Sequence, residues 1–422
     1  MEIVRSLGPI GHLAVLLEEG SLLTPLFTSF GVEVVSTAEE AVAFRPEGVV
    51  TYSEAAVLRT ADLCAELGLP GLGRTAARAL RDKAAQRGML SHVDAIGFRR
   101  CHGTQELDAA IRDLGFPVVV KPADGWGSKG TVAVRTIAER DAVLLGQLRR
   151  GPLLGDVVVE RELVGRKDMG GHGDYVSVET LVQRGEVTPL VITGKLPLLP
   201  PFREPGQYLP AAIPDALARA IERLVVDACR ALEIADGVLH VEVKLCEDGP
   251  HLIELNGRLG GFVQALVWEH YGVDMIQLAA QVALGQDVRA HVAEFLRRPE
   301  KVTVQHFNQA PLDGGRLVAV TGHDRVRRLD GVSIYRSLEA VGARLSPTVA
   351  THDLDFIQGS RRDYAGAFDL LNHALESVQF VFEIDGHHVP LSGAELLRRN
   401  RDNRSTSARG PHGPAWTLTT EG

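Results

Sequence analysis

A lysine followed closely by a glycine-rich loop is the first feature of this sequence that could do chemistry. Lys121 ends the β-branched run Val118 to Val120, which reads as an interior strand. The loop after it contains Gly125, Gly127, Ser128, Lys129 and Gly130. Glycines let backbone N–H groups approach phosphate oxygens without interference from a Cβ atom. The pattern suits a nucleoside triphosphate, although such turns are common and Lys121 could be an ordinary strand-end lysine with its charge in water.

A second group of polar residues alternates along two segments that flank the turn sequence Glu247-Asp-Gly-Pro250. This pattern predicts an antiparallel hairpin over residues 240–258. Because side chains two apart share a face, each strand of the hairpin presents its polar groups on one side. These groups are His240, Glu242 and Lys244 on the first strand, and Glu254, Asn256 and Arg258 on the return strand.

The polar face of this hairpin is a candidate metal site. Two carboxylates and an amide carbonyl are hard oxygen ligands suited to Mg²⁺, so we expect Glu242, Glu254 and Asn256 to bind it. Arg258 could hold a phosphate or carboxylate through two hydrogen bonds. A solvated face is the usual explanation for alternating charge on antiparallel strands. The metal site is favoured because the segment from Glu254 to Gly261 combines three polar groups with three glycines, which a plain hairpin does not need.

Together these segments resemble the ATP-grasp enzymes, and specifically the carboxylate–amine ligases that include the bacterial L-amino acid (dipeptide) ligases. The similarity extends from about Gly48 to about Gly285. It implies a mixed α/β (α+β) ATP-grasp fold with an α/β domain before it and a C-terminal subdomain that closes over the active site. The implied division is an N-terminal domain (1–73), a lid subdomain with the glycine loop (74–150), a large subdomain (151–285), a C-terminal subdomain (286–397) and a polar, disordered tail (398–422).

The resemblance also assigns a nucleotide site. Lys83, in Arg81-Asp-Lys83, is implied as the second phosphate-binding lysine beside Lys121. Glu160 and the backbone after it are similar to the residues that hold the adenine edge in the family. Asp174, in the segment from Gly173 to Glu179, is the implied ribose ligand, and residues 166–172 resemble an insertion in the family's pattern.

For catalysis, the resemblance implies that Glu242, Glu254 and Asn256 hold two Mg²⁺ ions, which Mn²⁺ can replace. Lys121 and Arg258 would neutralise charge on the transferring phosphoryl group. The implied substrate contacts are Lys195, Glu204, Gly206, Arg258 and Gly260. His240 could deprotonate the attacking amine, since histidine titrates near neutral pH, or it could be a hydrogen-bonded structural histidine.

The implied reaction converts a carboxylate, expected to be an amino acid or related small acid, into an acyl phosphate at the expense of ATP. An amine, expected to be an amino acid, then attacks, and ADP and phosphate are released. Two alternatives stay open. One is an ATP-grasp enzyme that phosphorylates bicarbonate or formate, and the other is a non-catalytic nucleotide-binding regulator.

Composition limits the remaining choices. The 422 residues carry a formal net charge of −9, which argues against nucleic acid as a partner. The four cysteines lack any Cys-x-x-Cys spacing, so neither a zinc site nor a disulfide framework is suggested. No stretch reaches the roughly 18 apolar residues that a membrane helix requires. We expect a cytoplasmic enzyme, a homodimer, with small-molecule substrates and no membrane partner.

Hydrophobic patterns predict further elements that position these residues. We expect strands over 32–36, 48–51 and 301–306, and helices over 53–67, 214–232 and 365–377. The helix that begins at Pro214 has an apolar stripe that reads as core packing.

Overall fold

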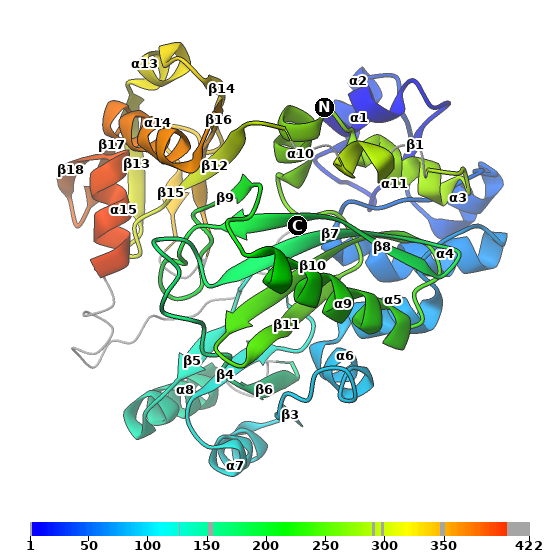
Figure 1. Ribbon diagram of the computed structural model, residues 1–422, viewed down its shortest axis with the longest axis horizontal. Coiled ribbons are helices and arrows are strands. Elements are labelled where there is room, and N and C mark those ends of the chain that lie inside the picture. The colour runs from blue at the N-terminus through cyan, green and yellow to red at the C-terminus, as the bar shows by residue number, and fades with distance from the viewer. Residues whose placement is uncertain are drawn as a thin grey trace.

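A computed structural model describes residues 2–125, 127–150, 155–288, 292–296, 299–346 and 351–402. Its centre is an eight-stranded antiparallel sheet with the order β11-β10-β7-β8-β9-β12-β16-β14 (Figure 1). The strands of this sheet are β7 (Tyr175–Gln183), β8 (Glu186–Lys195), β9 (Gly206–Leu209), β10 (Gly237–Cys246), β11 (Gly249–Asn256), β12 (Val302–Gln309), β14 (Val332–Ser337) and β16 (Asp353–Arg361).

Helices cover both faces of the first half of this sheet. One face packs against α4 (Val57–Leu67), α5 (Arg74–Arg81) and α9 (Asp215–Ala231). The other packs against α1 (Glu2–Leu7), α10 (Val263–Tyr271) and α11 (Met275–Ala283). The expected helix after Pro214 is confirmed as α9, which crosses in front of the sheet, and its apolar stripe is buried in the core because those residues recur every three or four positions.

A smaller four-stranded sheet, with the order β3-β6-β4-β5, lies below the large one in Figure 1. It consists of β3 (Phe98–Cys101), β4 (Val118–Pro122), β5 (Val132–Val134) and β6 (Val157–Arg161), with helices α7 (Thr104–Leu114) and α8 (Ile137–Arg150). Helix α6 (Lys83–Met89) joins it to α5. We call this sheet with α7 and α8 the lid. The lid extends past the expected boundary at residue 150, because β6 pairs with both β3 and β4.

The N-terminal and C-terminal parts contain smaller sheets. At the N-terminus, β1 (Ala14–Leu16) and β2 (Glu33–Val35) pair in parallel beside α2 (Thr24–Ser29), α3 (Ala38–Ala43) and the short helix η1 (Glu54–Ala56). At the C-terminus, β13 (Gly315–Thr321), β15 (Arg344–Leu345), β17 (Gln379–Ile384) and β18 (His387–Ser392) form a four-stranded sheet. Further C-terminal helices are η2 (Ala293–Leu296), α13 (His323–Arg328), α14 (Tyr364–Ser377) and α15 (Gly393–Asp402).

Three further sequence expectations differ from the structure. Residues 48–51 form no strand, because this segment lies against the end of α11, where a Cβ on Gly48 would come 2.9 Å from the Ala283 carbonyl oxygen. The large sheet crosses the expected boundary at 285/286, since β12 pairs with β9. The polar tail was expected from residue 398, yet α15 continues to Asp402 because Asn400 is buried and donates to the Gln309 carbonyl. The rest of that tail lies outside the described residues.

Candidate active site

The predicted hairpin is confirmed as β10 and β11, and its register sets the polar face. Glu242 is paired with Glu254, and His240 is paired with Asn256. Between these polar positions, Val241 and Leu255 are buried in the core on the opposite side. The three expected metal ligands therefore share one face of two adjacent strands.

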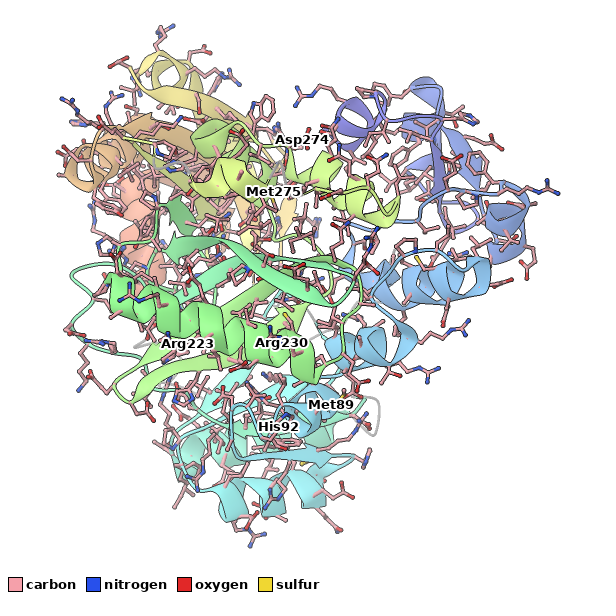
Figure 2. All side chains as sticks on the ribbon, turned by 45° about the vertical axis from the view of Figure 1, so that its right-hand side comes forward. Met89, His92, Arg223, Arg230, Asp274 and Met275 are labelled. Atoms are coloured by element: carbon pink, nitrogen blue, oxygen red, sulfur yellow. The ribbon has the colours of Figure 1, made fainter. Side chains whose placement is uncertain are left out.

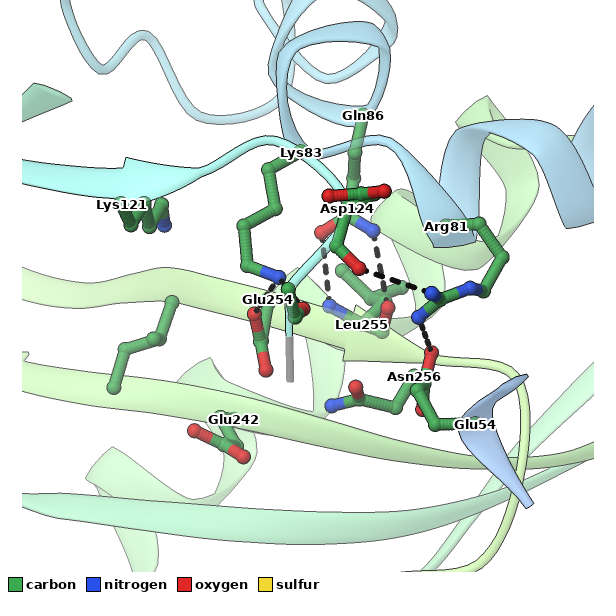
Figure 3. Close-up of polar contacts among 12 residues, drawn as sticks. Glu54, Arg81, Lys83, Gln86, Lys121, Asp124, Glu242, Glu254, Leu255 and Asn256 are labelled. Atoms are coloured by element: carbon green, nitrogen blue, oxygen red, sulfur yellow. Dashed lines mark hydrogen bonds and ion pairs between the residues drawn. The ribbon is translucent and has the colours of Figure 1, made fainter. Parts of the chain in front are cut away.

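Lys83 begins helix α6 and reaches this face from above (Figure 3). Its Nζ lies 3.2 Å from Oε2 of Glu254 and donates to the carbonyl oxygen of Gly125. The helix is fixed to the hairpin by Gln86, whose side chain donates to the Leu255 carbonyl at 3.0 Å and accepts from its N–H at 2.9 Å. One expected phosphate ligand, the glycine loop and one expected metal ligand are thus brought together.

The backbone of the glycine loop has the conformation that exposes N–H groups. Gly127, Ser128 and Gly130 have φ angles of 60°, 55° and 72°, in the left-handed region. A turn that contains such residues can point neighbouring N–H groups into one concavity that suits an anion. The loop follows β4 directly, and Arg81 donates to the Asp124 carbonyl at 3.0 Å at its start. Lys129 is exposed on this loop.

Lys121 and Glu160 form a buried ion pair inside the lid. Nζ of Lys121 lies 2.9 Å from Oε2 of Glu160, and Arg87 from α6 reaches the same oxygen at 3.1 Å. Burial lowers the pKa of Lys121. Burial alone would raise the pKa of Glu160, but Lys121 and Arg87 outweigh it and lower this pKa to about 2. The other oxygen of Glu160, Oε1, is buried without a hydrogen-bond partner among the described residues, so it can accept a donor from a ligand.

Asp174 lies at the start of β7, where Lys244 holds it at 2.7 Å between Nζ and Oδ1. About a third of the Asp174 side chain is exposed, so it can still accept a hydrogen bond from a ligand. The segment before it, residues 166–172, forms a loop, and Arg166 donates from its backbone to the Leu245 carbonyl.

Arg258 is held by a residue that the sequence reasoning did not assign to the site. Its Nε lies 2.9 Å from Oε2 of Glu54, and Arg81 contacts Oε1 of the same carboxylate at 2.8 Å. Glu54 is buried on η1 between these two guanidinium groups, as Figure 3 shows for the Arg81 contact. The carboxylate compensates both charges and fixes the direction of Arg258 at the end of the hairpin.

His240 is buried between two carboxylates. Its Nδ1 contacts Glu179, which is fully buried, and its Nε2 lies 3.6 Å from Glu242. Burial would lower the pKa of His240, but Glu179 and then Glu242 raise it to about 9. The contact with the fully buried Glu179 favours the structural alternative for this residue. Gly260 is needed beside it, because a Cβ there would come 2.4 Å from the imidazole Nδ1.

The expected acceptor-side residues cluster around a buried lysine. Lys195 is 2% exposed and its Nζ donates to Glu204 and to Gln207, both at 2.8 Å. Tyr175 also donates to Glu204, at 3.2 Å. Gly206 lets β9 approach β12 closely, since a Cβ there would come 2.3 Å from the Gln305 carbonyl oxygen.

Electrostatics connect this cluster to the metal face. Burial alone would raise the pKa of Glu242, but His240, Lys195 and Arg258 lower it to about 2. The structure therefore brings the expected metal, phosphate and acceptor residues into one neighbourhood. Glu54, Arg87 and Glu179 were missed. The segments that hold Glu54 and Glu179 were noted, but the ion pairs of all three residues join elements far apart in the sequence.

These residues fit ATP and a divalent cation. Glu242, Glu254 and Asn256 supply oxygen ligands, Lys83 and Lys121 supply cations, and the unpartnered Oε1 of Glu160 supplies an acceptor. The carboxylate of Glu254 is only partly buried and is balanced by Lys83, which leaves it accessible to a metal ion.

Comparisons with known proteins agree with this site. Residues 114–265 match the ATP-grasp domain family. Alanine–anticapsin ligase of Bacillus amyloliquefaciens is 26% identical over 267 residues, which cover 59% of this chain and 56% of that protein. Carnosine synthase 1 of Homo sapiens is 26% identical over 266 residues, which cover 57% of this chain and 31% of that protein. The chain therefore matches only part of the length of these relatives.

Among solved structures, the L-amino acid ligase from Bacillus licheniformis superposes with a TM-score of 0.68 at 25% identity, covering 82% of this chain and 83% of that one. The mixed α/β fold class expected from the sequence is confirmed. Of the described residues, none lies in a helix long and apolar enough to cross a membrane. Residues 114–265 thus match an ATP-grasp domain, and the fold is similar to that of an L-amino acid ligase.

Proposed function

We propose that the protein is an ATP-dependent ligase that joins a carboxylate, of an amino acid or related small acid, to an amine, of an amino acid. The observation that carries this proposal is the convergence of Lys83, Glu254 and the glycine loop beside a second, buried lysine–glutamate cluster at Lys195. The proposal is supported by the similarity to alanine–anticapsin ligase and L-amino acid ligase, which their names describe as ligases, and to carnosine synthase.

In this proposal the protein positions reactants and compensates charge, and no protein nucleophile is needed. Lys83 and Lys121 bind phosphate oxygens of ATP, and the N–H groups of the glycine loop cover them. Glu160 accepts from the adenine edge, and Asp174 binds the ribose. Glu242, Glu254 and Asn256 hold Mg²⁺, which when bound spreads the negative charge of the phosphates.

Arg258 lies at the end of the metal face and compensates charge on the acid as its carboxylate accepts the γ-phosphoryl group. Transfer turns a carboxylate oxygen into a phosphate leaving group, so the amine can displace phosphate and form an amide. In this proposal Glu204, which accepts hydrogen bonds from Lys195 and Tyr175, binds the ammonium of the amine substrate. The glycine loop of the lid excludes water from the acyl phosphate.

A bicarbonate- or formate-phosphorylating enzyme is the second candidate, because it would use the same nucleotide and metal residues. The buried Lys195, Glu204 and Gln207 network favours the amide ligase, since it offers a carboxylate that an ammonium group can contact. A homodimeric, cytoplasmic protein stays a prediction.

The test is ADP formation with a panel of amino acids, at saturating ATP and Mg²⁺, with hydroxylamine in place of the amine. An amino acid substrate should give its hydroxamate together with ADP and phosphate. Release of AMP in proportion to product would contradict an acyl phosphate. ADP formation that responds to bicarbonate but to no amino acid would support the second candidate.

A further inference from the structure

We propose that Cys246, Asp248 and His251, at the closed end of the β10–β11 hairpin, form a binding site for a transition-metal cation such as Zn²⁺. One donor atom from each residue lies within 4.8 Å of the other two. No role in ATP or substrate binding has been assigned to these residues. The site is independent of the proposed ligase activity.

The geometry of the donors is close to that of a tetrahedral site. Nε2 of His251 lies 3.2 Å from Oδ1 of Asp248. Ligands at about 2.0 Å from a tetrahedral zinc are separated by roughly 3.3 Å, so these two atoms are already at the required spacing. The thiol sulfur, which lies within 4.8 Å of the other two donors, must come to roughly 3.5 Å from each of them to form a zinc–sulfur bond of about 2.3 Å. Asp248 is 77% exposed on the turn, so it can move to accommodate this.

The hairpin register brings the donors to one face. Cys246 pairs with Gly249 and His251 pairs with Lys244, so the turn folds His251 back beside the thiol. The turn residue Asp248 closes the group from outside. Cys246 is further held by an isolated bridge to Gly165, which fixes its backbone.

Asp94 supplies the support that metal-bound histidines usually have. Its Oδ1 lies 2.8 Å from Nδ1 of His251, and its Oδ2 accepts the Leu252 N–H at 2.7 Å. A carboxylate on Nδ1 fixes the tautomer and directs Nε2 toward the metal. Asp94 is 7% exposed and comes from the segment between α6 and the lid. In Figure 2, Met89 marks the end of α6 and His92 marks this segment, below Arg223 and Arg230 of α9.

The donor set selects the kind of cation. A thiolate and an imidazole prefer Zn²⁺ or Co²⁺ over Mg²⁺, which takes oxygen ligands. Three protein ligands leave a fourth position for water. Cys246 follows Glu242 by four residues, which places the site roughly 13 Å along the strand from the expected Mg²⁺ ligands. The cation would stabilise the closed end of the hairpin that carries Glu242 and Glu254. The hydrogen bond between Asp94 and His251 would connect the site to the segment that leads to the lid.

A competing explanation uses the same atoms without a metal. A protonated His251 can donate to Asp94 through Nδ1 and to Asp248 through Nε2, forming two ordinary ion pairs. This explanation leaves the position of Cys246 without a function, and it predicts no cation binding.

The test is titration of chelator-treated protein with Co²⁺ in the presence of excess Mg²⁺. A sulfur-to-cobalt charge-transfer band in the near ultraviolet should appear and saturate at one equivalent, because carboxylate sites give no such band. Zn²⁺ should displace the band and raise the melting temperature. Cys246→Ser should abolish the band, and Cys101→Ser, which removes a buried thiol in the lid, should retain it.

Asp248→Ala gives a second variant that is expected to fold, because its side chain is exposed. It should weaken Co²⁺ binding by at least tenfold. The proposal is overturned if wild-type protein shows no charge-transfer band, if the band persists in Cys246→Ser, or if Asp248→Ala binds Co²⁺ with unchanged affinity.

Discussion

Lys83 at the start of α6 and Glu254 on β11 form an ion pair with 3.2 Å between Nζ and Oε2. The pair joins an expected phosphate ligand to an expected metal ligand. Each partly buried group compensates the other's charge in the ligand-free protein. In the proposed complex with ATP and its metal ion, Lys83 would pair with a phosphate and Glu254 with the cation. Neither side chain would then lose a partner of opposite charge, so binding would cost little in desolvation.

Glu254→Gln should therefore reduce turnover by roughly two to three orders of magnitude, because it removes a charged metal ligand and leaves the core side of β11 untouched. Steady-state ADP release measures this, and the melting temperature should stay within a few degrees of wild type. Glu247→Gln, at an exposed position on the same hairpin, is the control and should retain activity. A near-normal rate for Glu254→Gln would instead support the solvated hairpin face.

Glu54→Gln tests the residue that the sequence reasoning missed. Two guanidinium groups, from Arg81 and Arg258, share this buried carboxylate. Removing its charge leaves them uncompensated, and we expect a loss of about 3–5 kcal/mol in the free energy of unfolding. Because Arg258 would lose its orientation, hydroxamate formation should fall at least tenfold even under conditions where the variant is fully folded. Normal hydroxamate formation in folded protein would limit Glu54 to a structural role.

Glu204→Gln separates the two halves of the proposed reaction. Lys195 keeps its bond to Gln207 in this variant, so the buried network should survive. If Glu204 contacts the amine, hydroxamate formation should be largely spared while the KM for the amine rises by about tenfold or more, the cost of one charge-assisted contact. Equal loss of both reactions would show that the segment serves the whole site as support.

Local pattern was enough to predict the parts of the site that lie on one element. The alternation of His240, Glu242 and Lys244 fixed which side chains share a face, because a strand has a period of two. The glycine spacing after Lys121 likewise predicted a loop that exposes N–H groups. What could not be predicted are contacts between distant segments, such as Arg87 with Glu160 and Glu179 with His240.

Where the local pattern gave the wrong secondary structure, tertiary contacts account for the structure observed. The polar run after residue 398 reads as disordered, yet α15 extends into it as far as Asp402 because Leu396 and Asn400 are buried against the C-terminal core and β12. The expected strand at 48–51 was absent because the neighbouring surface is a helix end rather than a free strand edge.

Asp355 on β16 gives a prediction about the pH dependence of stability. Its Oδ1 accepts from Asn308 at 2.9 Å, whereas its buried Oδ2 has no hydrogen-bond partner among the described residues. Burial raises the pKa of Asp355 to about 7 from its ordinary value of 3.8. Between these two values the folded protein binds a proton at Asp355 that the unfolded chain has released, so the contribution of Asp355 to stability falls as pH rises from about 4 to about 7 and changes no further above that.

Asp355→Asn removes this titration while retaining an oxygen that can accept from Asn308. The variant should match wild type near pH 4 and be more stable at pH 8, by at most about 4 kcal/mol, since each pKa unit corresponds to about 1.4 kcal/mol. Denaturant unfolding at the two pH values measures the difference. Asp369→Asn, at an exposed position on α14, which packs on the same strand, is the control. Its difference in stability from wild type should be the same at both pH values. If Asp355→Asn is less stable than wild type at pH 8, then the buried carboxylate is ionised at little cost and its partners favour the charged form.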